Sequence, residues 1–187
     1  TNCHPFQYGR FLWMHNGAIE GFAGIRRKLR SSLSDECDAL IEGTTDSEHV
    51  FALFLHNLYR RGHDYSLDTL QQALAETIGQ IKDWTAGSAS SHKGSTCNFA
   101  VTDGQNLLAT RCSTHLDLAA PSLYISRGER FESVDGAYRM RSAKGDPRAI
   151  IIASEPLTAE RSEWEKVADS HLIAVTPEMH LRMTPVG

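Results

Sequence analysis

The sequence predicts an α+β fold, in which helices are grouped on a sheet face instead of alternating with the strands. Two observations support this prediction. After one strand-like run near the start of the chain, helical periodicity dominates residues 22 to 84. Strand-like segments separated by turn residues then fill the second half of the chain, from residue 99 to residue 183.

The first half contains one predicted strand and three predicted helices. The apolar run at residues 10–14 predicts a buried strand that stops at His-Asn-Gly, residues 15–17. Residues 22–33 place apolar side chains at helical spacing. A Thr-x-x-Glu capping box, formed by Thr45 and Glu48, starts a second helix that runs to Gly62. A third helix spans residues 66–84, with its core-facing side chains on one stripe: Leu67, Leu70, Leu74, Ile78 and Ile81.

The second half predicts strands joined by loops. Residues 85–95, TAGSASSHKGS, are small and polar and indicate a surface loop, whereas residues 99–111 alternate around an Asp-Gly turn and predict a hairpin. Residues 122–126 predict a strand, and residues 127–148 a polar excursion with at most a short hairpin. The apolar run AIIIAS, residues 149–154, predicts a strand buried on both faces. A final strand pair, HLIAV and HLRM, is joined through a Pro-Glu turn. We expect a single domain over residues 1–187, because no repeat or internal boundary interrupts the pattern.

Composition excludes several classes of protein. The 187 residues suffice for one domain with a substantial core, and a net charge of −4 gives no reason to expect nucleic acid or an anionic membrane as a partner. No apolar run is long enough to span a membrane. The 4 cysteines are scattered without a CxxC pair, which favours free thiols in a reducing cytoplasm. The 9 histidines form no set with metal-ligand spacing, so we expect neither a metal nor a cofactor.

Three short motifs are candidates for chemistry: NCHPF near the start, HNG at residues 15–17 and TDSE at residues 45–48. Each alone has an ordinary structural explanation, since Asn-Gly is a common turn and Asp46 beside a helix start can be a cap. Together they predict a site. A strand that ends in Asn-Gly can direct the Asn16 side-chain N–H and the Gly17 backbone N–H to one point, where two donors stabilise the oxyanion of acyl transfer. Asp46 can hold a cationic α-amino group, which suits glutamine or another γ-glutamyl compound.

In this order the three motifs resemble the glutamine-binding half of class II glutamine amidotransferases, which are N-terminal-nucleophile hydrolases with a four-layer αββα fold. Other segments extend the resemblance over most of the chain: TDSEHVFALFL, NFAVTDGQNLLATR, SLYIS and IIIASEPLTAERSEW. This fuller pattern is most similar to the fungal amidotransferase-like subunits of the alternative glutathione-degrading complex. It resembles the bacterial γ-glutamyl hydrolases of ergothioneine biosynthesis less closely. The resemblance implies an αββα sandwich that is truncated at its N-terminus.

The resemblance implies roles for particular residues. Asn16 and Gly17 match the oxyanion-hole pair of the family, the asparagine through its side chain and the glycine through its main chain. Asp46 matches the carboxylate that binds the substrate α-amino group, and His4 matches a histidine near the glutamine pocket. The segment 154–156, Ser-Glu-Pro, matches a stretch that follows a core strand, and we interpret it as structural.

The resemblance also indicates which parts of the family's machinery this sequence does not match. In the family the nucleophile is a cysteine at the mature N-terminus, whose own α-amine serves as base, and an upstream motif supplies an arginine for the substrate carboxylate. Cys3 and Thr1 both align with internal parts of the family's chain, and we interpret Cys37, Cys97 and Cys112 as ordinary thiols. We therefore expect that an N-terminal block carrying the nucleophile is absent from this chain, which would leave it unable to turn over substrate and would expose a sheet edge.

The sequence leaves three functional hypotheses open. The first is an amidohydrolase that cleaves the γ-glutamyl bond of glutathione or of a γ-glutamyl amide through an N-terminal cysteine acyl-enzyme, together with a metallopeptidase-like partner subunit. The second is a glutaminase domain that supplies ammonia to a partner synthase. The third is a non-catalytic remnant that acts as a binding subunit. The coding sequence upstream of Thr1 separates them, because Met-Cys before a strand supports an enzyme and a true start near Thr1 supports the remnant.

Overall fold

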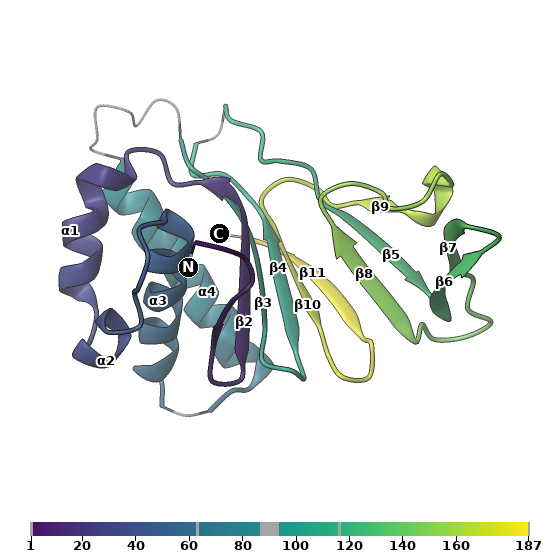
Figure 1. The fold of residues 1–187 in the computed structure, drawn as a ribbon, viewed down its shortest axis with the longest axis horizontal. Helices are drawn as coiled ribbons and strands as arrows, with labels where there is room; N and C mark the ends of the chain where they lie inside the picture. Colours follow the sequence, from purple (N-terminus) through teal and green to yellow (C-terminus); the bar gives the residue numbers. More distant parts are fainter. Residues whose placement is uncertain (1, 63, 87–93, 116, 187) are drawn as a thin grey trace.

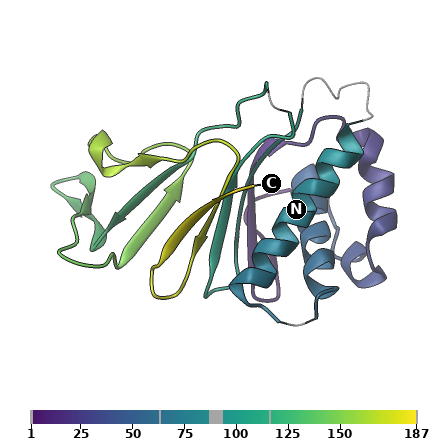
Figure 2. The ribbon, with the colours of Figure 1, turned by 180° about the vertical axis from the view of Figure 1, so that it is seen from behind.

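Helices cover one face of a six-stranded sheet, and a three-stranded sheet packs against its other face (Figure 1). The computed structural model describes residues 2–62, 64–86, 94–115 and 117–186. Seen from behind, the helices again lie together on one side, and the hairpin of β6 and β7 extends from the opposite end (Figure 2). The predicted grouping of helices on a sheet face is confirmed. Of the four expected layers, the described residues form one helical layer and two sheets.

The helical layer consists of α1 (Phe22–Ser32), α2 (Asp35–Asp38), α3 (Asp46–Tyr59) and α4 (Leu67–Thr85). The three longer helices confirm the predictions, whereas the single turn of α2 is too short to produce a helical pattern in the sequence. Helix α3 packs against α1, α4 and the sheet, so it is buried nearly all round and carries apolar residues on most of its faces. No helix among the described residues has the length and apolarity to cross a membrane. The predicted loop at residues 85–95 falls largely on residues 87–93, outside the described part of the chain.

The start of α3 differs from the expected capping box. Thr45 caps the helix as predicted, because its Oγ1 accepts a hydrogen bond from the Glu48 N–H at 3.3 Å. The Glu48 carboxylate instead accepts the N–H groups of Glu42 and Gly43, at 3.0 and 2.8 Å. The motif therefore fixes the loop before α3 as well as the helix end, and this loop leads directly to Asp46.

The six-stranded sheet is antiparallel, with the order β1-β2-β3-β4-β10-β11. The predicted hairpin at residues 99–111 and the predicted final strand pair are both present, whereas β1 was not predicted. The strands are β1 (Phe6–Tyr8), β2 (Phe11–Ala18), β3 (Thr96–Thr102), β4 (Leu107–Arg111), β10 (His171–Val175) and β11 (Leu181–Pro185).

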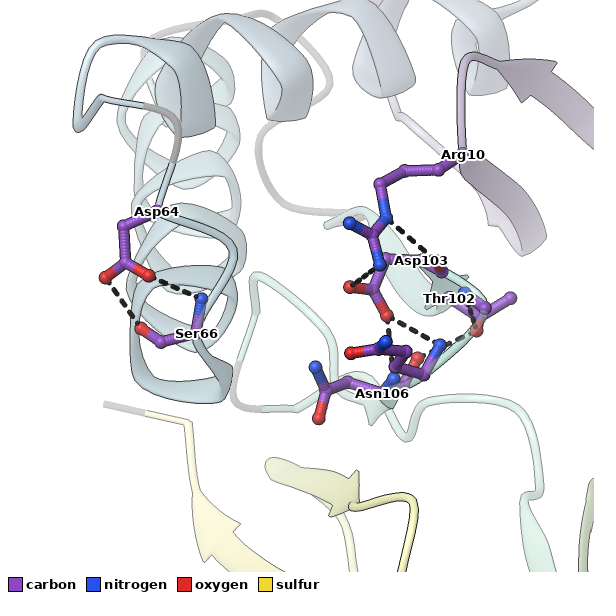
Figure 3. Close-up of polar contacts among 8 residues, drawn as sticks. Arg10, Asp64, Ser66, Thr102, Asp103 and Asn106 are labelled. Carbon is purple, nitrogen blue, oxygen red and sulfur yellow. Dashed lines mark hydrogen bonds and ion pairs between the residues drawn. The ribbon is translucent and has the colours of Figure 1, made fainter.

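Asp103 explains the strong turn signal between β3 and β4 (Figure 3). Its carboxylate accepts the N–H groups of Gln105 and Asn106, at 3.0 and 2.7 Å, and so closes the loop. Arg10, directly before β2, donates its Nε–H to the Asp103 carbonyl at 3.0 Å and pairs with the carboxylate at 3.3 Å. A buried charge of this kind is tolerated because it is both paired and hydrogen-bonded.

Strand β2 is longer than predicted. The expectation that the chain turns at His-Asn-Gly is wrong, because residues 15–17 continue the antiparallel pairing with Phe99, Asn98 and Cys97 of β3. Alternate β2 side chains point to opposite faces. Phe11, Trp13 and His15 face the helices, and fully buried Trp13 packs against three phenylalanine rings there. Leu12, Met14 and Asn16 face the side of the three-stranded sheet.

The second sheet has the order β8-β5-β9, with β8 (Ala149–Ala153), β5 (Tyr124–Gly128) and β9 (Glu165–Lys166). Its inner side chains, including Ile125 and Ile152, pack against Ala109 and Ile173 of the larger sheet. The prediction that β8 is buried on both faces is wrong, since all five residues are half-buried. Strand β8 is an edge strand, and the described helices lie beyond the larger sheet. Residues 127–148 hold the short hairpin of β6 (Arg130–Val134) and β7 (Ala137–Arg141).

Candidate active site

The structure brings the HNG and TDSE motifs together where the end of β2 meets the start of α3. The Ile19 N–H donates to the Asp46 carboxylate at 2.7 Å. The His15 ring contacts the Ser47 hydroxyl, with 2.9 Å between Nδ1 and Oγ. Two motifs that are thirty residues apart in the sequence therefore form one polar cluster.

The Gly17 N–H points away from β3. The Ala18 N–H donates to Thr96 Oγ1 on β3 at 3.1 Å, and consecutive N–H groups of a strand point to opposite edges. Cys97, the residue opposite Gly17, donates its own N–H to the carbonyl of Cys112, directly after β4. On the outer edge, the pairing of β2 with β1 ends at Trp13, so no strand among the described residues pairs with Gly17 there. Among the described residues its N–H thus has no strand partner on that edge, as an oxyanion donor requires.

A glycine is required at position 17 because of a close backbone approach. A Cβ built on Gly17 would overlap the carbonyl oxygen of Thr96, and would also lie 2.8 Å from His15 Nε2. The first of these atoms belongs to the backbone of a paired strand and cannot move aside easily. The requirement is therefore steric, and it comes from β3.

Asn16 points to the opposite face of β2 from His15. Its Nδ2–H donates to Ser154 Oγ at 3.1 Å, across the gap between the two sheets. Ser154 follows β8 directly, in the Ser-Glu-Pro segment interpreted as structural. Sequence reasoning did not connect Ser154 with Asn16, since 138 positions separate them and no local pattern joins them.

The Asp46 carboxylate lies at the N-terminus of α3, where the helix dipole favours negative charge. One oxygen accepts the Ile19 N–H and the other the Ser47 N–H, both at 2.7 Å. A carboxylate offers about four lone-pair positions, so these two bonds leave acceptor capacity for an ammonium group. The side chain is half-buried. Binding of a substrate amino group by Asp46 stays a prediction.

His15 joins three elements of the site. Its Nε2 lies 3.0 Å from the Thr96 carbonyl, which only accepts, so Nε2 carries a proton and Nδ1 accepts from the Ser47 hydroxyl. Desolvation lowers the pKa of this 8%-exposed ring, against the smaller raising effects of the Thr96 carbonyl and the Asp46 charge. The neutral ring is therefore the resident form. Strand alternation was the missed signal, because His15 is in phase with buried Phe11 and Trp13.

His4 lies beside this cluster. The exposed ring packs edge-on against Phe6 of β1, with 5.0 Å between the centroids. Its charge is close enough to lower the pKa of His15, although burial of His15 has the larger effect. Among the described residues, no hydrogen bond joins His4 to Asn16, Gly17 or Asp46, and its role in a substrate pocket stays a prediction.

The four cysteines are free thiols with different surroundings. Cys3 is exposed, whereas Cys37, Cys97 and Cys112 are buried. The neighbouring Cys112 thiol and burial together raise the pKa of Cys97, which keeps it protonated and unreactive. These environments agree with the interpretation of the buried cysteines as structural thiols.

The two sheets stack under one helical layer, and the end of β2 carries amide groups near the start of α3, an arrangement that acyl transfer can use. The family model for class-II glutamine amidotransferases matches residues 1–183. The chain belongs to this family of glutamine-hydrolysing enzymes.

Comparisons with individual proteins agree with this family. The chain is 40% identical over 186 residues to the probable glutamine amidotransferase DUG3 of Saccharomyces cerevisiae, covering 94% of this chain and 52% of that protein. It thus spans about half the length of this curated relative. A class-II domain protein from Silicibacter pomeroyi has a similar structure, with a TM-score of 0.67 and 27% identity over 98% of this chain and 70% of that one.

A third similarity concerns the fold alone. The glutamine phosphoribosylpyrophosphate amidotransferase of Bacillus subtilis matches with a TM-score of 0.56 and 13% identity, over 100% of this chain and 32% of that one. With the Silicibacter protein, it indicates that the described layers have the N-terminal-nucleophile hydrolase fold, as the resemblance implied.

We expect Gly17→Ala to lower the free energy of unfolding by about 1–3 kcal/mol, because the new methyl group overlaps the Thr96 carbonyl and forces the strands apart. Gly79→Ala in α4 is the matched control. Nothing lies near that position, so alanine should raise the stability by up to about 1 kcal/mol through its helix propensity. Urea unfolding of both variants measures the difference, and equal effects would contradict the steric requirement at Gly17.

We expect the stability to fall as the pH falls below 6.5, the ordinary pKa of histidine. The folded state holds His15 neutral while the unfolded chain accepts a proton, so acid favours unfolding. His49 and His56, whose pKa values burial also lowers, act with the same sign. His15→Gln should reduce the pH dependence below 6.5 without abolishing it. Urea unfolding over a pH series tests this prediction. At about pH 8, where histidines are neutral, the difference in the free energy of unfolding between the wild type and His15→Gln reports lost packing alone. An unchanged slope would exclude His15 as a contributor.

Proposed function

We propose that this chain forms the substrate-binding part of an amidohydrolase that cleaves the γ-glutamyl bond of glutathione or of a γ-glutamyl amide. One observation supports the proposal above others. The Asn16 amide and the outward-directed Gly17 N–H lie at the end of β2, and the Asp46 carboxylate of α3 contacts the same end through the Ile19 N–H. A γ-glutamyl group needs both parts, because its α-amino group is a cation and its γ-carbonyl becomes an oxyanion when attacked.

In the proposed mechanism, each residue has a separate task. Asp46 holds the α-amino group of the substrate and so fixes the distance to the γ-carbonyl. Attack at that carbon turns its oxygen into an alkoxide, which the Asn16 side-chain N–H and the Gly17 backbone N–H stabilise. The carbon–nitrogen bond then breaks, the nitrogen takes the electron pair and a proton, and the glutamyl group remains on the nucleophile until water releases it.

We propose that the nucleophile is an N-terminal cysteine of the full-length protein, outside these 187 residues. Cys3 has its α-amine in a peptide bond, and the other three cysteines are buried in the core. A longer natural chain also fits the similarity to DUG3, of which this chain covers 52%. In this proposal residues 1–187 belong to one glutamine amidotransferase domain.

The sequence resemblance to fungal amidotransferase-like subunits supports a further part of the proposal, membership of a glutathione-degrading complex with a metallopeptidase-like partner subunit. The free thiols fit a protein of the reducing cytoplasm. The alternatives are a glutaminase domain that feeds a partner synthase and a non-catalytic binding subunit. Hydrolysis of glutathione and of glutamine by the full-length protein, with and without its partner, separates the three functions.

For the full-length protein we expect Asn16→Ala to lower kcat by about 100- to 1,000-fold, the usual effect of removing one oxyanion donor. KM should change little, because the donor acts mainly on the transition state. Asn16→Asp is the matched variant, since it keeps the side-chain shape but replaces the N–H donor by a negative charge, so it should lose at least as much activity. Steady-state kinetics with glutathione and glutamine measure the effect, and undiminished turnover in Asn16→Ala would exclude the oxyanion role.

Asp46→Asn should act on substrate binding instead. The asparagine keeps an acceptor for the Ile19 N–H but loses the negative charge, so we expect KM to rise by about 10- to 100-fold with a smaller change in kcat. Asp83→Asn, an exposed position on α4, controls for the loss of one charge. A KM like that of the wild type would rule out Asp46 as the ammonium-binding group.

A further inference from the structure

A cavity of about 190 Å³ lies between the two sheets, next to Asn16. Its walls come from β2, β3 and β4 on one side and from β8 and residues before β5 on the other. Three side chains supply polar groups, namely Asn16, Asn98 and Ser154. The remaining walls are apolar and include the side chains of Met14, Ala100, Leu123 and Ile152. The cavity thus combines a small polar end with an apolar interior.

Asn98, which lines this cavity, has an unused acceptor. Its Nδ2–H donates to the Pro121 carbonyl at 2.9 Å, which fixes the orientation of the amide because a carbonyl accepts only. Its Oδ1 is buried and has no hydrogen-bond partner, and the residue is only 4% exposed. An unpaired acceptor in a buried position is costly, and such groups normally have a partner. The residues that the structure describes therefore leave the Asn98 Oδ1 without the donor that a buried acceptor needs.

The cavity and Asp46 lie on opposite sides of the Asn16–Gly17 backbone. Asn98 is the cross-strand neighbour of Asn16, and both side chains line the cavity on the face toward the three-stranded sheet. Asp46 lies on the helical side, together with His15 and Ser47. A substrate whose amino end is held by Asp46 and whose γ-carbonyl reaches Asn16 therefore directs its far end toward the cavity.

We infer that this cavity is the subsite for the leaving amine, with Asn98 Oδ1 as the acceptor for the N–H of the scissile bond. The inference rests on the proposed function. The γ-carbonyl oxygen needs donors and finds them in Asn16 and Gly17, whereas the scissile nitrogen carries an N–H and needs an acceptor. Asn98 accepts this hydrogen bond without taking the proton, and the nitrogen leaves as an amine after the carbon–nitrogen bond breaks. The apolar walls fit a γ-glutamyl peptide whose second residue is small and uncharged.

Filling the cavity tests its role as a subsite. In the full-length protein, Ala100→Val places two methyl groups on the cavity wall at a strand position that suits a branched residue. The ratio of kcat/KM for glutathione to kcat/KM for glutamine should fall by about 10-fold or more, because only the larger leaving group meets the new methyl groups. This ratio does not depend on the fraction of folded protein. Ala137→Val, at an exposed position on β7, should leave it unchanged.

Removing the acceptor tests Asn98 itself. Asn98→Ala should lower the ratio of kcat/KM for glutamine to kcat/KM for the γ-methyl ester of glutamate by about 10-fold. In the ester, an oxygen without a hydrogen replaces the scissile nitrogen. The ester therefore makes no hydrogen bond to Asn98 that the substitution could remove. Loss of the Pro121 contact affects both substrates equally and cancels in the ratio.

The outcomes separate the inference from the proposed function. If the wild-type protein hydrolyses γ-glutamyl substrates but neither ratio changes in the variants, the cavity holds an ordered water molecule only and the inference is wrong. If the wild-type protein, assayed with and without its partner, hydrolyses none of these substrates, the proposed function fails and the inference with it. A fall of both ratios in the stated directions supports the subsite and its acceptor.

Discussion

The geometry of the candidate site depends on the buried His15 ring, which hydrogen-bonds through both nitrogens. Nε2 donates to the Thr96 carbonyl of β3, and Nδ1 accepts from Ser47 in the first turn of α3. These two bonds fix the end of β2 against a neighbouring strand and against a helix. Because the ring is buried and therefore neutral, it satisfies one acceptor and one donor and leaves no charge in the core. The relative position of Asn16 and Asp46 follows from this connection.

The same constraint makes the backbone of Gly17 a rigid donor. Since β2 continues through residue 18, the direction of each N–H is set by strand geometry and by the pairing with β3. Donors held on regular elements are positioned more closely than donors on mobile loops. The absence of a side chain at Gly17 allows Thr96 to approach, so the residue that exposes the N–H also permits the tight packing behind it.

Local patterns in the sequence predicted the elements that local interactions determine. The long helices follow from apolar spacing and caps such as Thr45, and the β3–β4 hairpin follows from the turn-forming side chain of Asp103. The wrong predictions concern features that depend on contacts between segments far apart in the sequence. Strand β2 continues past Met14 because β3 supplies partners, and β8 is half-buried because it forms a sheet edge. The contact between Asn16 and Ser154 could not be predicted for the same reason, as it joins two different sheets.

The alternation of a strand accounts for the division of the site. His15 and Asn16 are neighbours in the sequence and point to opposite faces of β2. The helical face leads through Ser47, whose N–H donates to the Asp46 carboxylate, so it suits recognition of the charged end of a substrate. On the other face, Asn16 and Asn98 line the apolar cavity, so this face suits the leaving group. The Gly17 N–H lies between the two faces, at the strand edge, where the proposed reaction places the scissile bond. One strand can thus separate recognition from release, because each residue along it changes face.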